Sequence, residues 1–162
     1  MTPLQDPLPR GSETSLVLTH LMQPADANYL GNIHGGVIMK LIDEAAGACA
    51  FRFCRTNIVT AAIDRIDFHH PVQVGNLVRL LANVNYAGRT SVEVGVRVEA
   101  EDLTTGMVTH TNSAYLVFVA LSGTGRPMPV PQLTPVTDEQ KAWYEKAAER
   151  RRKRLAEREP AD

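Results

Sequence analysis

The chain has 162 residues, of which 44% are hydrophobic and 22% are charged, and its formal net charge is -1. This length suits a single domain that buries its own core without metal or disulfide support. The balanced charge excludes a general attraction to nucleic acid or to anionic lipid, so any ligand must be recognised by local features.

The first residues, "MTPLQDPLPRGSETS", contain three prolines and no apolar segment of the kind found in secretory signals. We therefore expect residues 1–13 to form a flexible leader of a cytoplasmic protein. No apolar run approaches the roughly 20 residues of a membrane span, so no membrane partner is expected. The two cysteines, Cys49 and Cys54, are five residues apart on a predicted helix and point in directions roughly 140° apart, so we expect free thiols.

A short strand is predicted for residues 14–22, followed by a loop in "QPADANYLGN". Residues 35–54 have the pattern of a helix with apolar residues on more than one stripe, which predicts a helix buried nearly all round. The polar residues Lys40, Glu44 and Gly47 form a narrow strip on this helix, with Asp43 at its edge. Glu44 is expected in solvent beside Lys40.

The sequence after Asn57 has the alternation of a β-sheet. The segments "LVRLLANVNYAG", "SVEVGVRVEAED" and "MVTHTNSAYLVFVAL" predict three antiparallel strands joined by the short turns "AGRT" and "DLTTG". The preceding "IVTAAIDRIDFHHPV" is rich in β-forming residues but loses its alternation at 64–67, which predicts a bulge. The residues expected on one buried face are Val78, Leu80, Ala82, Val84 and Tyr86, then Val92, Val94, Val96, Val98 and Ala100.

A proline-rich linker is predicted at 123–136, and Thr137 with Gln140 forms a capping box for a charged, amphipathic C-terminal helix within 137–162. The expected fold class is α+β, with a curved antiparallel sheet of five to six strands wrapped around one long apolar helix over residues 14–122. A sheet edge and part of the helix would remain uncovered, which favours pairing with a second copy.

Asp43 is the leading candidate for chemistry, because a carboxylate among apolar residues needs either a partner or a function. The alternative is a helix-edge residue paired with Lys40 or with an arginine. Gly35 and Gly36, at the start of the helix, can expose free N–H groups to a carbonyl oxygen, or they can merely permit a tight turn. Asn32 could orient water or a carbonyl, and His34 could act as a base; both also fit structural roles in a turn or a cap.

Other chemistries lack their sequence signals. No Cys, His or acidic cluster has the spacing of metal ligands, and the motifs of serine hydrolases and of phosphate-binding loops are missing. The basic run "RRRKR" at 150–154 is interleaved with glutamates, which favours a solvated face over a nucleic-acid site.

The combination of "GNIHGG" with "MKLIDEAAG" at this spacing, together with "TAAIDRIDFHHPVQVGN", "AGRTSVEVGVRVEAED" and "AYLVFVAL", resembles the hotdog-fold acyl-CoA hydrolases of the YciA and brain acyl-CoA hydrolase type. The resemblance covers about residues 15–121. It implies a long helix wrapped by an antiparallel sheet, dimers that build hexamers as trimers of dimers, and hydrolysis of acyl-CoA to a fatty acid and coenzyme A without a further cofactor.

The resemblance also implies roles for particular residues. Asp43 would be the catalytic carboxylate, acting as general base or nucleophile, with Asn32 completing the site from the neighbouring subunit. In such a site we expect the Gly35 and Gly36 amides to stabilise the oxyanion. The coenzyme A moiety needs cations and hydrogen-bond donors at the mouth of the site. The candidates for this substrate-binding role are His34, Arg89, Thr90 and Ser91.

Two other functions remain open at this point. A hotdog dehydratase or hydratase would use His34 for proton transfer, although the proline-rich signature of that branch is absent around His34. A non-catalytic acyl-CoA sensor would use the basic C-terminal helix as a partner contact, although it would not need both Asn32 and Asp43.

Overall fold

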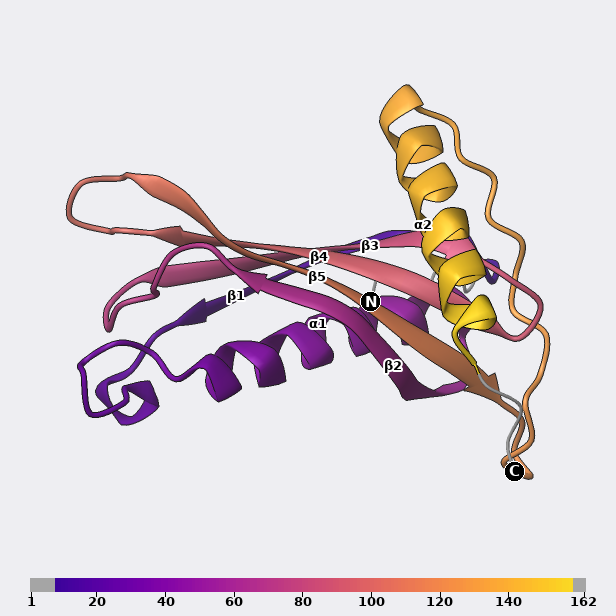
Figure 1. The fold of residues 1–162 in the computed structure, drawn as a ribbon, viewed down its shortest axis with the longest axis horizontal. Coiled ribbons are helices and arrows are strands. Elements are labelled where there is room, and N and C mark those ends of the chain that lie inside the picture. The colour runs from indigo at the N-terminus through magenta and orange to yellow at the C-terminus, as the bar shows by residue number, and fades with distance from the viewer. Residues whose placement is uncertain (1–7, 159–162) are drawn as a thin grey trace, which may run out of the picture.

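Residues 8–158 are described in a computed structural model, and they form a five-stranded sheet with one long helix on each face (Figure 1). The elements in chain order are β1 (Ser15–Leu21), a 3-10 turn η1 (Pro24–Asp26), α1 (Gly35–Cys54), β2 (Asn57–Phe68), β3 (Leu77–Ala87), β4 (Ser91–Glu101), β5 (Val108–Leu121) and α2 (Asp138–Ala156). The predicted long helix, the antiparallel sheet and the C-terminal helix are therefore confirmed.

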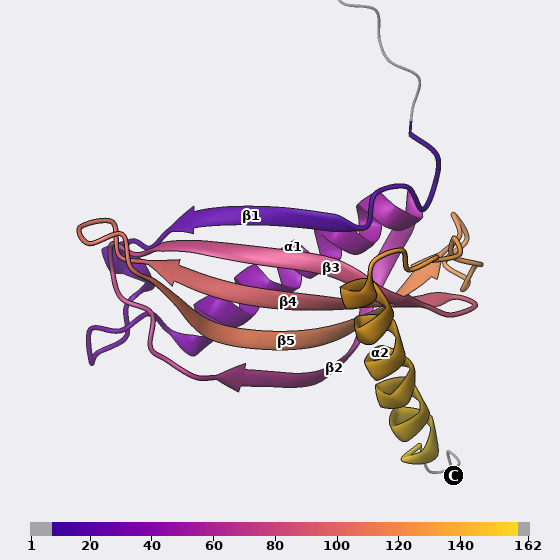
Figure 2. The same cartoon turned by 90° about the horizontal axis from the view of Figure 1, so that it is seen from above.

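The strands are ordered β1-β3-β4-β5-β2, and every neighbouring pair is antiparallel. We call the face covered by α1 the inner face and the face crossed by α2 the outer face (Figures 1 and 2). In Figure 2, α2 crosses the strands near one end of the sheet, whereas α1 runs beneath them along much of their length. β2 is an edge strand, which leaves its outer edge free to pair with another chain.

The core lies between the inner face and α1, where the predicted alternation of β4 is confirmed. The prediction for Tyr86 is wrong. The β3–β4 register shifts between Val84 and Tyr86, so Tyr86 lies opposite Glu93 on the outer face and its ring stands 4.8 Å from that of Tyr144 in α2. A bulge at Asn85 causes this change, because one extra residue moves every following side chain to the other face.

β2 also departs from regular pairing with β5. The register shifts twice, between Thr60 and Ala62 and between Ile63 and Arg65, so Ala61 and Asp64 are the extra residues. The second shift confirms an irregularity where the sequence lost its alternation. Two bulges so close together bend an edge strand and change which side chains it presents to each face.

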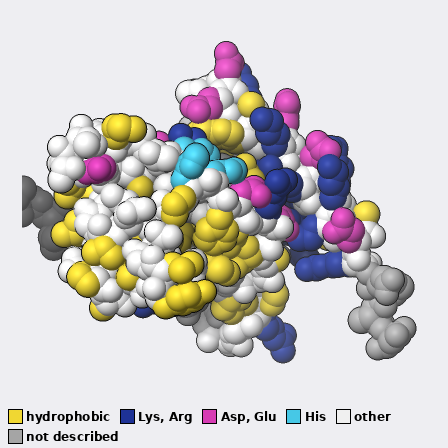
Figure 3. All heavy atoms as spheres, turned by 60° about the vertical axis from the view of Figure 1, so that its left-hand side comes forward, with side chains coloured by type: hydrophobic (Ala, Val, Ile, Leu, Met, Phe, Trp, Pro, Cys, Tyr) yellow, Lys and Arg dark blue, Asp and Glu magenta, His cyan; other side chains and the backbone are white. Residues whose placement is uncertain are grey.

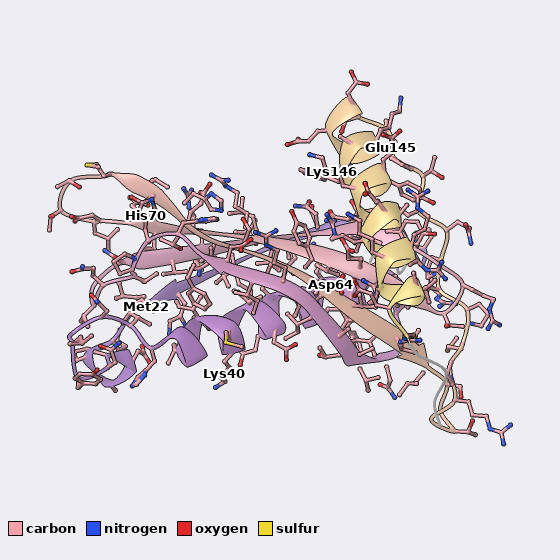
Figure 4. The ribbon with its side chains drawn as sticks, viewed as in Figure 1. Met22, Lys40, Asp64, His70, Glu145 and Lys146 are labelled. Atoms are coloured by element: carbon pink, nitrogen blue, oxygen red, sulfur yellow. The ribbon has the colours of Figure 1, made fainter. Side chains whose placement is uncertain are left out.

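α1 buries nine residues against the sheet, including Ile42 and Phe53. Its opposite side is uncovered, with Met39 43% and Phe51 49% exposed. The prediction of a helix buried nearly all round is therefore wrong for the single chain, because the sheet lies on only one side of the helix. Lys40 points away from the sheet (Figure 4) and lies 3.8 Å from Glu44, as predicted.

α2 begins with the predicted capping box, in which the Gln140 N–H donates to the Thr137 hydroxyl and the Gln140 side chain accepts from the Thr137 N–H. The prediction that the basic run is a solvated face is wrong for Arg150 and Arg154, which face the sheet and form ion pairs with Glu93 and Asp64. Arginines one helical turn apart share a face, so two of them can contact the sheet while their neighbours stay in solvent.

The predicted leader falls partly outside the described residues, since 1–7 are not described. In its described part, the Gly11 N–H donates to the Phe53 carbonyl (2.9 Å) and Arg10 donates to the Cys54 carbonyl (2.7 Å). These contacts hold residues 10–11 against the end of α1. Among the helices of residues 8–158, none is long and apolar enough to cross a membrane.

Candidate functional site

Asp43 lies in the third turn of α1, on the side of the helix that the sheet leaves exposed. The hydroxyl of Thr60 in β2 donates to its Oδ1 at 2.9 Å. No ion pair to Asp43 occurs among the described residues, which removes the alternative in which Lys40 or an arginine neutralises it. An accessible carboxylate with one oxygen held by a hydroxyl keeps its other oxygen free for a reactant.

The N-terminus of α1 has unsatisfied main-chain donors. His34 is the N-cap residue, and its side chain makes no capping hydrogen bond. The first N–H groups of the helix that donate to the His34 carbonyl are those of Val37 and Ile38. Open space surrounds Gly36, whereas a Cβ at Gly35 would stand 3.5 Å from the Phe68 ring. The two glycine amides are thus free to bind a partly negative oxygen.

Two asparagines lie close together in the loop before α1. The Asn28 Oδ1 accepts hydrogen bonds from the N–H groups of Leu30 (2.9 Å) and Asn32 (3.2 Å), and the Asn28 N–H donates to the Asn32 carbonyl (2.7 Å). These bonds fix the Asn28 amide with its NH₂ group left as a donor. The Asn32 side chain forms no hydrogen bond to the described residues.

Arg89 and Thr90 lie in the turn between β3 and β4, and Ser91 is the first residue of β4. The Thr90 carbonyl accepts from the Ala120 N–H at 2.9 Å. The pairing of Ser91 with Val119 places this turn at the sheet end where β2 begins and α1 ends. α1 begins, with Gly35 and Gly36, at the opposite end of the sheet (Figure 2). One chain therefore does not bring Arg89 together with Gly35 and Gly36.

The surface around Asp43 is apolar and continuous with the free edge of β2. Large exposed hydrophobic residues on these two elements are Met39, Phe51, Val59, Ile63 and Phe68. Figure 3, which brings forward the end of the sheet where α1 begins, shows hydrophobic side chains gathered there and charged side chains toward α2. Exposed apolar residues beside an unpaired strand edge are typical of a subunit contact.

Other chemistries find little support in the structure. Burial raises the pKa of the Cys49 thiol to about 12 and that of Cys54 to about 11, so both stay protonated at neutral pH and neither is a nucleophile. The two thiols are free, as predicted. Within residues 8–158 no group of three or more His, Cys, Asp or Glu side chains is placed to hold a metal ion.

Comparison with known proteins places this chain in a family. Residues 30–107 match the model of the thioesterase superfamily. Protein VdlD of Helicobacter pylori is 40% identical over 141 residues, which cover 87% of this chain and 80% of VdlD. The chain belongs to the thioesterase superfamily.

Solved structures agree with the sequence comparison. A hexameric acyl-CoA thioesterase, solved in its apo form, is 41% identical, with a TM-score of 0.85 over 92% of this chain and 97% of the other. An acyl-CoA hydrolase from Staphylococcus aureus, solved with butyryl coenzyme A and coenzyme A, is 33% identical, with a TM-score of 0.84 over 93% of this chain and 92% of its own. The hotdog fold and the acyl-CoA hydrolase class expected from the sequence are thus confirmed.

Structures of the S. aureus enzyme are also known with an aspartate, an asparagine or a threonine replaced by alanine. Asn28, Asp43 and Thr60 in this chain have the same residue types and the same spacing. Of these three residues, sequence reasoning singled out only Asp43. No local signal marks Thr60, which reaches Asp43 only through the fold, while Asn28 looked like any other asparagine in a turn-rich loop.

Proposed function

We propose that this thioesterase hydrolyses acyl-CoA at a site built around Asp43. Water adds to the thioester carbonyl, the carbon–sulfur bond breaks, and a carboxylic acid and coenzyme A leave. The observation that carries this proposal is an accessible carboxylate, held by Thr60, on a helix whose N-terminal amides are uncapped.

Each group has a defined role in the reaction. The carbonyl oxygen accepts hydrogen bonds from the Gly35 and Gly36 amides, which stabilise the negative charge that develops on it. Asp43 either takes a proton from the attacking water or attacks the carbonyl itself. Thr60 holds the carboxylate in one orientation, so that its Oδ2 faces the reactants.

Two subunits must supply these groups. Asp43 is eight residues into α1, roughly 12 Å from the start of the helix along its axis. Pairing of two β2 edges about a two-fold axis makes the α1 helices antiparallel, so that each helix start faces the third turn of the other. The exposed apolar residues of α1 and β2 support this pairing, and the hexameric similar structure supports a trimer of such dimers.

The loop before α1 supplies an amide from the partner subunit. The sequence predicts Asn32 for this role, and the hydrogen bonds around Asn28 favour Asn28 as the donor, with the Asn32 N–H fixing its orientation. Alanine at Asn28 should then lower kcat more than alanine at Asn32 does. The reverse order would return the role to Asn32.

Arg89 binds the coenzyme A phosphates. In the same two-fold pair the partner's β3–β4 turn lies at the end of the molecule where α1 begins, which supports a role across subunits for Arg89, Thr90 and Ser91. Arg89→Ala should raise KM for acyl-CoA more than it lowers kcat, and it should have little effect on a short pantetheine thioester. Equal losses with both substrates would assign Arg89 a structural role.

The central test is acyl-CoA hydrolysis by Asp43→Asn, measured over a panel of chain lengths. We expect kcat to fall by about two orders of magnitude, the range for a lost general base, with the assembly unchanged. Glu44→Gln is the matched control, because it changes the neighbouring exposed acid, and it should retain activity. Full activity in Asp43→Asn would refute the mechanism, and an essential Glu44 would move the site by one residue.

Subunit mixing tests the shared site. Inactive Asp43→Ala and Asn28→Ala proteins, mixed under conditions that exchange subunits, should regain activity, because one site of each mixed dimer carries neither change. Random exchange predicts about a quarter of wild-type activity for a two-fold composite site. No recovery despite demonstrated exchange would place the whole site in one chain. The cytoplasmic location expected from the sequence stays a prediction.

A further inference from the structure

The basic run of α2 contains two arginines that anchor the helix to different strands. Arg150 binds both carboxylate oxygens of Glu93 in β4 at 2.6–3.2 Å, and its guanidinium lies 3.7 Å from the centre of the Tyr115 ring. Arg154, one turn later, pairs with Asp64 in β2. The Arg154 and Asp64 side chains are 19% and 18% exposed, so this contact is partly shielded from solvent.

Asp64 is the extra residue of the second bulge in β2. Pairing with β5 passes from Ile63–Leu116 to Arg65–Tyr115 without it, and the bulge turns Asp64 toward α2 (Figure 4). β2 has a neighbouring strand on only one side within the chain. The bulged segment 61–64 is therefore hydrogen-bonded to a strand, β5, on one side only, and the Arg154 contact gives it a second attachment.

Thr60 comes directly before this segment. It pairs with Phe118, whose side chain is buried in the core, so Thr60 faces the inner side of the sheet and reaches Asp43. Successive residues of a strand point to opposite faces, so the bulges decide which side chains share the face of Thr60. A change in the bulged segment would turn or shift the Thr60 hydroxyl relative to the Asp43 carboxylate.

We infer that Arg154 is a positioning residue for the reaction: through Asp64 it fixes the bulged segment of β2 and thereby holds Thr60 against Asp43. This inference rests on the proposed function, in which Asp43 is catalytic. Arg154 lies on the outer face and does not reach the reactants, so α2 acts on the site through the sheet. The opposing possibility is that Arg154 only attaches α2.

The test compares steady-state acyl-CoA hydrolysis by the full chain and its variants. Arg154→Ala and Asp64→Asn should each lower kcat about tenfold with KM within about twofold, because misplacing a catalytic group affects the transition state more than binding. Arg154→Lys, which keeps the charge, should recover most of the activity.

Two control variants separate positioning from attachment. Glu93→Gln weakens the other anchor of α2, which lies in β4 and is separated from β2 by β5. Lys153→Ala removes an exposed cation that, among the described residues, pairs with Glu149 alone. Both should keep kcat within about twofold of wild type. A loss in Glu93→Gln as large as in Arg154→Ala would show that attachment of α2 is the cause, and would overturn the inference.

A double-mutant cycle with Thr60→Ala decides whether the effect passes through Thr60. In that background Arg154→Ala should cost less than about twofold, because its target is already gone. A second full tenfold loss, or an unchanged kcat in Arg154→Ala alone, would overturn the inference. If Arg154→Ala fails to fold, Asp64→Asn, nearly identical in shape to wild type, takes its place in the cycle. A wild-type protein without hydrolysis would instead refute the proposed function.

Discussion

α1 and α2 lie on opposite faces of one sheet and are held there by different forces. α1 buries nine residues in the core, whereas α2 buries one, Ala147, and relies on the Arg150–Glu93 and Arg154–Asp64 contacts. The two helices also differ at their N-termini, where α2 has the stronger hydrogen bonding. α2 begins with a complete capping box, and α1 begins without a side-chain cap.

This difference assigns the two helices separate tasks. Apolar burial is non-directional and holds α1 along its length, so its attachment to the sheet does not depend on a cap at its start. Ion pairs are directional, so α2 makes contact at two defined points of the sheet. α1 is thus held by apolar contacts along its length, whereas α2 is held by its capping box and by two arginine contacts.

The largest expected effect lies in the apolar core. Phe53 is fully buried in α1, and Phe53→Ala should lower the free energy of unfolding by about 3–5 kcal/mol, measured by urea denaturation. Phe51→Ala is the control, because Phe51 is half-exposed on the same helix. A loss for Phe51→Ala that depends on protein concentration would place Phe51 in a subunit contact. A loss as large as that of Phe53→Ala, but independent of concentration, would contradict the assigned packing.

The ion pairs of the outer face should contribute less. Glu93 is 3% exposed, so Arg150→Ala leaves a buried carboxylate without its partner and should cost about 2–3 kcal/mol. Adding Glu93→Gln to Arg150→Ala removes the unpaired charge and should recover part of that loss. Thermal denaturation of the single and double variants measures both. If the double variant is no more stable than Arg150→Ala, then Glu93 is not held as a buried charge.

The same contrast explains what could be predicted from the sequence. The bounds of α1, the alternation of β4 and the capping box of α2 depend on residues close together in the chain, and they were predicted correctly. Asp43 and the two glycines also stand out locally, as a carboxylate and a flexible start on an apolar helix. The fold class follows from these elements and from a distinctive pair of motifs.

Features that depend on distant residues were missed. Thr60 meets Asp43 from 17 residues away on another element, and Arg150 meets Glu93 from 57 residues away. The bulge at Asn85 reversed the face of Tyr86. The alternation of apolar and polar residues does not reveal where a strand contains one extra residue. Such contacts are set by register and by the packing of α2, neither of which an alternation pattern contains.

The capping box of α2 supplies the next smaller effect. Thr137→Ala removes the hydroxyl that accepts from the Gln140 N–H and should cost about 1 kcal/mol. Thr137→Ser keeps the hydroxyl and should be close to wild type in thermal denaturation. Equal losses in both variants would mean that packing of the threonine methyl group, and not capping, matters at this position.

The smallest expected effect has the opposite sign and tests why α1 is uncapped. Serine is a preferred N-cap residue, so His34→Ser should bind one of the free amides and stabilise the protein by about 0.5–1 kcal/mol. The same bond would compete with a carbonyl oxygen for the amides at the helix start, so kcat should fall while stability rises. His34→Ala is the control, because it removes the imidazole without adding a cap. A fall in kcat confined to His34→Ser would show that the amides are used in the reaction. An equal fall in His34→Ala would assign the effect to the loss of the imidazole. An unchanged kcat in both variants would mean that the reaction does not use the start of α1.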